Sequence, residues 1–204
     1  MQRRNLLVGA LAPAVLAPLA PARAVNGIPA PRRLVLRHAT TGARFSGSYH
    51  DGRAIDPAAM ADISAVLADS RTGTVHAFDP TVLDILWETG QRARMRGEFL
   101  VVSGFRTPAT NAAVCGAGNS QHLRAGAIDV CVAATQLATF GSAALALRRG
   151  GVGLYASQGF VHLDSGPVRQ WGGGTPASTG PAAVNPADDR LNRLAEAWAA
   201  TRQP

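Results

Sequence analysis

The chain contains no lysine, so all 20 of its basic residues are arginines. Aromatic residues make up only 5% of its 204 residues, and no group of them is interleaved with the arginines. The formal charge of +7 falls to +4 when Arg3, Arg4 and Arg23 near the N-terminus are set aside. Charge alone therefore does not indicate a nucleic-acid-binding protein, and we expect no nucleic-acid partner; the mild basic excess suits an anionic polymer as partner.

Long hydrophobic runs are scarce as well. An apolar run at residues 6–19 is interrupted by two prolines and is shorter than the roughly 20 residues that a transmembrane helix needs. It follows the pair Arg3-Arg4 and precedes Ala22-Arg23-Ala24, a small-x-small cleavage pattern. We predict that residues 1–24 are a twin-arginine-like signal that exports the folded protein to the periplasm. A membrane anchor is the alternative; after removal of the signal we expect no stable membrane insertion.

Cysteine is nearly absent, with only Cys115 and Cys131 in the chain. In an oxidising compartment two such residues predict a disulfide. The bridge would close a loop of about 15 residues and would stabilise the fold by roughly 3 kcal/mol in the chain-entropy model. The alternative is a pair of thiols that never meet.

The apolar content of 47% and the chain length predict one globular domain with its own core. Asp56-Pro57 and Asp79-Pro80 each combine a capping aspartate with a proline at the first helical position, so each predicts the start of a helix. We predict an α+β fold, with a small antiparallel sheet flanked by helices. Strands are expected at residues 34–37, 44–49, 98–103, 127–132, 152–155 and 160–164, a third helix at 136–148, and a linker with a final helix over 172–204.

Two of the five histidines lie in segments that carry several polar groups. His122 precedes the predicted strand at 127–132, and His162 lies in the strand at 160–164. Because side chains alternate along a strand, Asp129 points away from its apolar neighbours, and His162 and Asp164 share one face. A carboxylate buried in such a strand needs a partner, which a metal ion or an arginine can supply. Two histidines and one aspartate are a suitable ligand set for an open zinc site. Taken singly, each histidine is more typical of a surface loop or of a satisfied core position.

Three motifs resemble segments of one group of enzymes. Ser120, His122 and Asp129 resemble the Ser-x-His-(six residues)-Asp signature of zinc D-Ala-D-Ala peptidases and related murein hydrolases. The segment 103–107, Ser-Gly-Phe-Arg-Thr, resembles the segment that precedes that signature in the same enzymes. Residues 150–171 are similar to the C-terminal block of the MepK-type murein endopeptidases, and the turn 50–53 and the paired arginines are also similar to that subgroup.

This resemblance implies a hedgehog/DD-peptidase-like fold, with residues 25–171 as a zinc peptidase domain. It implies that His122, Asp129 and His162 bind Zn²⁺ and that Arg106 steadies a substrate carboxylate or the developing oxyanion. The expected substrate is the peptide cross-link of peptidoglycan, which an exported basic protein would meet and which a metal-activated water would hydrolyse. A carboxypeptidase acting on stem peptides and a wall-binding pseudo-enzyme are the alternatives.

The sequence departs from its relatives at two places. Many relatives have glycine where this chain has Ala125, which predicts a small adjustment of that turn. Relatives that have Glu or Asp three residues before the last histidine use it as general base, and here that position is Gly159. Asp164 is the nearest acidic substitute, either as the base or as the group that orients His162. Arg169 is expected to contact substrate or to form a structural salt bridge.

Overall fold

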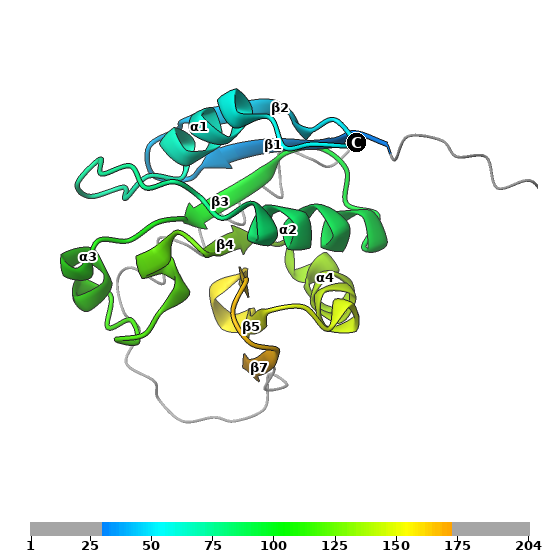
Figure 1. The fold of residues 1–204 in the computed structure, drawn as a ribbon. Helices are drawn as coiled ribbons and strands as arrows, with labels where there is room; N and C mark the ends of the chain where they lie inside the picture. The colour runs from blue at the N-terminus through cyan, green and yellow to red at the C-terminus, as the bar shows by residue number, and fades with distance from the viewer. Residues whose placement is uncertain (1–29, 173–204) are drawn as a thin grey trace, which may run out of the picture.

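The computed structural model describes residues 30–172, which form one seven-stranded sheet with helices packed against it (Figure 1). Across the sheet the strands follow the order β2-β1-β3-β4-β6-β5-β7. Among the described residues, no helix is long and apolar enough to cross a membrane. The strands are β1 (Arg32–His38), β2 (Arg44–His50), β3 (Phe99–Ser103), β4 (Ala127–Cys131), β5 (Gly151–Tyr155), β6 (Phe160–Asp164) and β7 (Arg169–Gly172).

The sheet is larger than predicted, and it is mixed rather than antiparallel. β1 pairs in parallel with β3, and β5 pairs in parallel with β7, whereas the other neighbours are antiparallel. The first parallel pair arises because the chain leaves β2 and passes through two helices before it returns as β3, and parallel neighbours need such a crossover. The second arises because residues 169–172, for which the sequence predicted no strand, form β7 and add to the free edge of β5.

Both predicted helix starts are confirmed. The carboxylate of Asp56 accepts hydrogen bonds from two backbone N–H groups in the first turn of α1 (Pro57–Val66), and that of Asp79 accepts one from Thr81 N–H in the first turn of α2 (Pro80–Arg92). Helix α4 (Ala134–Leu147) lies close to its predicted range. A short helix, α3 (Pro108–Ala113), was not predicted.

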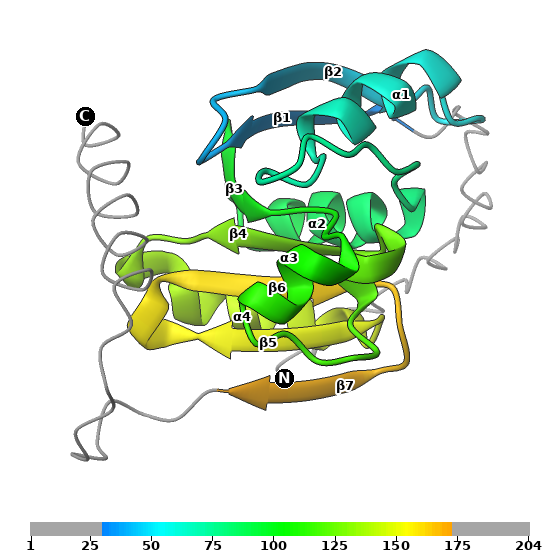
Figure 2. The same cartoon turned by 90° about the vertical axis from the view of Figure 1, so that its left-hand side faces the viewer.

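The helices divide between the two faces of the sheet. α1 contacts β1 and β2, α2 contacts β1 and β6, and α4 contacts β5 and β6, so these three helices cover the face that holds the main core. Figure 2 shows α3 in front of the central strands and α4 behind them. The other face of the sheet, on which α3 lies, has few buried apolar residues, and buried polar side chains occupy part of it.

The predicted alternation along β4 and β6 is confirmed. Ile128 and Val130 of β4 belong to the main core, as do Val161 and Leu163 of β6. Their sequence neighbours Asp129, His162 and Asp164 are buried as well, but on the opposite face. The fold therefore gathers the polar residues of two adjacent strands on one side of the sheet.

The predicted disulfide is wrong, because both cysteines are free thiols. Cys131 is 1% exposed and packs beside Leu100 on the sheet, whereas Cys115 is exposed just after α3. The two residues belong to different parts of the fold, and spacing in the sequence could not reveal this.

The remaining predictions concern the two ends of the chain. The signal at residues 1–24 and the helix within 172–204 lie outside the described residues, except that Gly172 ends β7 rather than beginning a linker. The domain boundaries drawn from the sequence therefore remain a prediction.

Candidate metal centre

Three predicted ligands meet at one point on the polar face of the sheet. The side chains of His122, Asp129 and His162 are buried, and one ligand atom from each lies within 4.8 Å of the others. His162 Nδ1 is 2.7 Å from Asp129 Oδ1, and His122 Nε2 is 3.2 Å both from Asp129 Oδ2 and from His162 Nδ1. Two imidazole nitrogens and a carboxylate in this arrangement match the donor set of a tetrahedral metal with one open position.

The two strand ligands are adjacent because of the sheet register. Asp129 on β4 is paired directly with His162 on β6, so their side chains leave the same face next to each other. His122 comes from a 3₁₀ turn, Gln121–Arg124, that begins at Ser120, whose hydroxyl accepts a hydrogen bond from the His122 N–H at 3.3 Å. Ser120, the serine of the signature, therefore caps the turn that carries His122.

Ala125 ends that turn with a φ of 52°, in the left-handed region. The turn that carries His122 is formed with alanine in a conformation that a glycine would favour, and the adjustment of this turn relative to the relatives stays a prediction. An alanine in this region costs about 1–2 kcal/mol relative to a right-handed conformation. The surrounding contacts, including the hydrogen bond from Asp79 N–H to the Ala125 carbonyl at 3.0 Å, hold it there.

Each histidine is oriented by a hydrogen bond on the nitrogen that faces away from the centre. His122 Nδ1 donates to the carbonyl of Gly104 at 2.6 Å, which leaves Nε2 free to act as a ligand. His162 Nε2 lies 2.9 Å from Asp164 Oδ2. Such outer hydrogen bonds select the tautomer and fix the ring of a metal-binding histidine.

The environment shifts the pKa values of all three ligands in the protein without metal. Burial lowers the pKa of His122, which favours its neutral form. For His162 burial acts in the same direction, but hydrogen bonds to Asp129 and Asp164 outweigh it and raise its pKa to about 9. The pKa of Asp129 is held well below its ordinary value, because the two histidines offset the cost of its burial.

Arg106 lies at the edge of the same cluster. Its Nη2 donates to Asp129 Oδ2 at 2.5 Å, and its Nε donates to the hydroxyl of Ser103 at 2.7 Å. The Arg106 N–H also donates to the His122 carbonyl at 3.1 Å, which ties the segment 103–107 to the turn of the first histidine. The structure thus brings the first two sequence motifs together around Asp129.

Asp164 lies on the far side of His162 from the other ligands. Its side chain is 0% exposed and accepts hydrogen bonds from the N–H groups of Gly151 at 3.0 Å and Gly166 at 2.8 Å. Arg169 binds the same carboxylate with both terminal nitrogens, at 2.6 and 3.0 Å. Arg169 therefore forms the structural salt bridge that was one of its two predicted roles. Despite its burial, these partners keep the pKa of Asp164 below its ordinary value.

Gly159, at the position where an acid was expected, closes the short turn between β5 and β6 with a φ of 68°. A left-handed conformation of this kind favours glycine over a residue with a side chain. Its carbonyl accepts a hydrogen bond from Val132 N–H at 3.0 Å. In this chain the position builds a turn and supplies no carboxylate.

Trp171 is a neighbour of the centre that sequence reasoning did not single out. Its ring centroid lies 5.1 Å from that of His162, and the guanidinium of Arg169 lies 5.0 Å from the Trp171 ring. Trp171 also donates from its indole nitrogen to the Tyr155 hydroxyl at 2.9 Å. The alternation Arg169-x-Trp171 was a signal for a strand with both side chains on one face.

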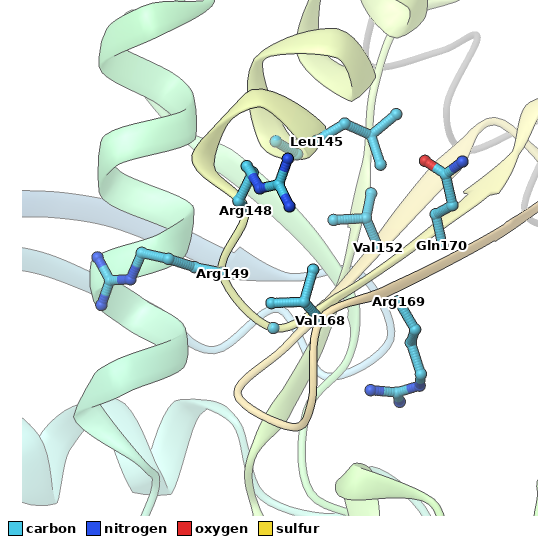
Figure 3. Close-up of a pocket in the computed structure, with 9 residues that line it drawn as sticks. Leu145, Arg148, Arg149, Val152, Val168, Arg169 and Gln170 are labelled. Carbon is cyan, nitrogen blue, oxygen red and sulfur yellow. The ribbon is translucent and has the colours of Figure 1, made fainter.

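A cavity of about 320 Å³ lies away from this cluster, between α4, β5 and β7 (Figure 3). Three arginines border it, but Figure 3 shows that they point apart. Arg149 reaches Glu88 of α2 at 3.2 Å, and Arg169 reaches Asp164. None of the three candidate ligands lines this cavity, so it is not part of the candidate metal centre.

The fold and the centre together define a class: an α+β protein with a buried His-Asp-His set suited to a metal ion. Residues 27–171 match the family model described as peptidoglycan L,D-endopeptidase MepK. The chain therefore belongs to this family of peptidases.

Two similar proteins cover most of the chain. A protein from Haemophilus influenzae described as a probable peptidoglycan L,D-endopeptidase MepK is 35% identical over 156 residues, which are 74% of this chain and 84% of the relative. The peptidoglycan L,D-endopeptidase MepK of Escherichia coli K12 is 30% identical over 175 residues, 83% of this chain and 96% of the relative.

Proposed function

We propose that this protein is an exported zinc endopeptidase that hydrolyses peptide cross-links in peptidoglycan. The observation that carries the proposal is the convergence of His122 Nε2, His162 Nδ1 and an Asp129 oxygen on one point. The outward nitrogen of each ring already has a partner, so the inward nitrogen is the one available to a metal. Membership of the MepK family supplies the substrate class.

His122, Asp129 and His162 would hold the ion. Zinc bound there would lower the pKa of a water molecule and polarise the scissile carbonyl. Among divalent ions, two imidazoles and one carboxylate suit zinc better than the oxygen-preferring magnesium or calcium. The proton on His162 Nδ1 in the metal-free protein has to leave before this nitrogen can act as a ligand.

Arg106 would bind charge on the substrate. Its guanidinium is fixed by Ser103 and Asp129 at the edge of the centre, and its side chain is 17% exposed. A planar, permanently charged group with free N–H donors is suited to a carboxylate or to the developing oxyanion. We propose the same role that the resemblance implied.

Asp164 would orient His162 and would not accept a proton from water. Both of its oxygens are already engaged by His162, Arg169 and two backbone N–H groups, and its side chain has no exposed surface. The imidazole of His162 stands between this carboxylate and the other two ligands. This arrangement favours the orienting role over the role of general base.

The experiment that tests the function is digestion of purified peptidoglycan, with the released fragments identified by mass spectrometry. We expect cleavage within peptide cross-links, loss of activity on chelation, and recovery on addition of zinc. Release of only terminal residues from stem peptides would instead identify a carboxypeptidase. Binding to the wall with no released fragment would identify a non-catalytic protein.

Metal analysis tests the ligand set. Wild-type protein is expected to hold about one zinc per molecule, and His162→Ala is expected to lose metal and activity together, because a three-ligand site cannot spare one ligand. The matched control is His50→Ala, which removes a histidine from the edge strand β2, separated from β4 by β1 and β3. Full zinc content in His162→Ala would end the assignment of this residue.

We also propose that residues 25–171 are the hedgehog/DD-peptidase-like peptidase domain, that 172–204 are a linker and a helix, and that the protein acts in the periplasm. The family match over 27–171 supports these boundaries. Limited proteolysis followed by mass spectrometry of the resistant fragment would test them.

A further inference from the structure

Two neighbouring rows of residues cross the sheet from β4 to β7. One row pairs Asp129, His162, Gly153 and Trp171 in succession. The next row, two residues away along the strands, pairs Ala127, Asp164, Gly151 and Arg169. Because every second residue of a strand faces the same side, both rows present their side chains on the polar face.

The strand between β6 and β7 contributes only glycine to these rows. A Cβ on Gly153 would lie 2.6 Å from Cε2 of Trp171, and a Cβ on Gly151 would lie 2.6 Å from Nη1 of Arg169 and closer still to Oδ2 of Asp164. Neither glycine has a positive φ, so the backbone does not require them. Glycine at position 153 leaves the space that the Trp171 ring occupies over β5, and glycine at position 151 leaves the space for the Asp164 carboxylate together with the Arg169 guanidinium that binds it.

Both side chains end at the second histidine ligand or at its partner. The ring of Trp171 lies 5.1 Å from the ring of His162. Arg169 binds both oxygens of Asp164, whose Oδ2 is the partner of His162 Nε2. A third contact joins the two, since the Arg169 guanidinium lies 5.0 Å from the Trp171 ring. His162 is thus enclosed from the β7 side by an aromatic ring and a salt bridge.

We propose that β7 is a positioning strand for the metal ligand His162, with Trp171 and Arg169 as positioning residues. Trp171 limits the tilt of the imidazole by ring contact, and Arg169 holds Asp164 in the orientation that fixes Nε2. Gly151 and Gly153 are the positions that allow both side chains to reach the centre. This inference rests on the proposed metal site, and it adds a structural role for the segment 150–171 that the ligand set does not explain.

The test measures zinc affinity by competition with a chelator in Gly153→Ala, Trp171→Ala and the double variant. Each single change is expected to weaken zinc binding by about 10- to 100-fold, the usual scale for a group that orients a metal ligand. Gly153→Ala acts by displacing Trp171, so the double variant is expected to bind zinc no more weakly than Trp171→Ala alone. Gly118→Ala is the matched control, because a Cβ there meets nothing within 4 Å.

The outcomes separate this inference from the proposed function. If wild-type protein binds no metal, the metal site itself fails. If wild-type protein binds zinc and Trp171→Ala binds it equally well, or if the two single effects add in the double variant, the role of Trp171 is overturned. Thermal midpoints of the metal-free variants are measured alongside, to detect any loss of stability. If Trp171→Ala destabilises β7, Gly153→Ala still tests the contact between the Trp171 and His162 rings, because it keeps every side chain of β7.

Arg169→Ala tests the second half of the inference. A positioning role predicts weaker zinc binding, with an unchanged KM for peptidoglycan fragments once zinc is saturating. Arg169→Lys, which keeps the charge but loses the two-pronged contact with Asp164, is expected to recover only part of the affinity. A rise in KM with unchanged zinc affinity would instead make Arg169 a substrate contact and would overturn its positioning role.

Discussion

At the scale of single residues, the function of Asp164 depends on which side of the imidazole it occupies. Asp164 Oδ2 contacts His162 Nε2, whereas Asp129 Oδ1 contacts His162 Nδ1, so the two carboxylates lie at opposite nitrogens of one ring. This geometry supports the proposed orienting role, in which the carboxylate of Asp164 would act on the metal centre through the imidazole. A general base has to lie within reach of the attacking water, and the His162 ring stands between Asp164 and the position where a metal-bound water would lie.

We expect Asp164→Asn to weaken zinc binding by about 10- to 100-fold, because an amide holds the His162 ring less firmly and leaves Arg169 without its charged partner. Zinc affinity and kcat are measured in parallel, with Asp62→Asn on the exposed side of α1 as the control. Normal zinc affinity together with a rate about 100-fold lower would show instead that Asp164 is the base.

At the scale of secondary-structure elements, Asp69 joins the loop after α1 to the start of α3. One of its oxygens accepts hydrogen bonds from the N–H groups of Arg71 and Thr72, and the other accepts from the N–H and hydroxyl of Thr107, at 2.7 and 2.8 Å. Thr107 is the N-cap of α3 and directly follows Arg106. This one buried carboxylate therefore fixes the backbone next to the candidate substrate-binding arginine.

Asp69 makes the stability of the fold depend on pH in the acid range. Burial disfavours the charge of Asp69, but its hydrogen bonds outweigh this and hold its pKa below the ordinary value. A carboxylate with a lowered pKa in the folded state stabilises the fold above its unfolded pKa of about 4, and this contribution is lost as the pH falls through the folded pKa.

We expect Asp69→Asn to lower the free energy of unfolding by about 1–3 kcal/mol near neutral pH, since the amide replaces one accepting oxygen with a donor. The difference from wild type should shrink as the pH falls below about 4, because the carboxylate of the unfolded wild-type chain then takes up a proton while that of the folded chain stays charged. Urea unfolding near neutral pH and below about pH 4 measures it. A difference that stays constant on acidification would contradict the role of the charge.

At the scale of the whole molecule, the fold keeps the thiols of Cys115 and Cys131 apart and leaves only the first exposed. Burial raises the pKa of the Cys131 thiol to about 11, so the native protein protects it from alkylation. Cys115 is exposed. In unreduced protein we expect one labelled thiol in the native state and two after denaturation, counted by mass spectrometry. Absence of any label after denaturation would restore the disulfide that the sequence suggested.

Export concerns the chain as a whole as well. If residues 1–24 are a twin-arginine-like signal, the mature protein should be recovered outside the cytoplasm without them. Replacing Arg3 and Arg4 by lysine should keep the charge but abolish export, because the route reads the arginine pair itself. Cell fractionation with N-terminal analysis measures both results. Unchanged export of this variant would indicate the general secretory route.

The sequence by itself determined the local features of this protein. Asp56-Pro57 and Asp79-Pro80 predicted two helix starts because a cap and a fixed φ act within a few residues. Alternation along β4 and β6 predicted which side chains share a face, because the side-chain period of a strand is a local property. The resemblance of three motifs to those of one group of enzymes implied that His122, Asp129 and His162 form one ligand set.

Only the tertiary structure decided which segments are neighbours. The parallel pairs β1–β3 and β5–β7, the free thiols, and the orientation of Asp164 all depend on contacts between residues far apart in the chain. The same holds for Gly153, which leaves room for Trp171 of β7, and for Gly151, which leaves room for Asp164 of β6 and Arg169 of β7. A local sequence pattern determines which secondary structure a segment forms and which way its side chains point. Which side chains then come into contact depends on strand register and strand order, and these are set by the burial of the whole sheet.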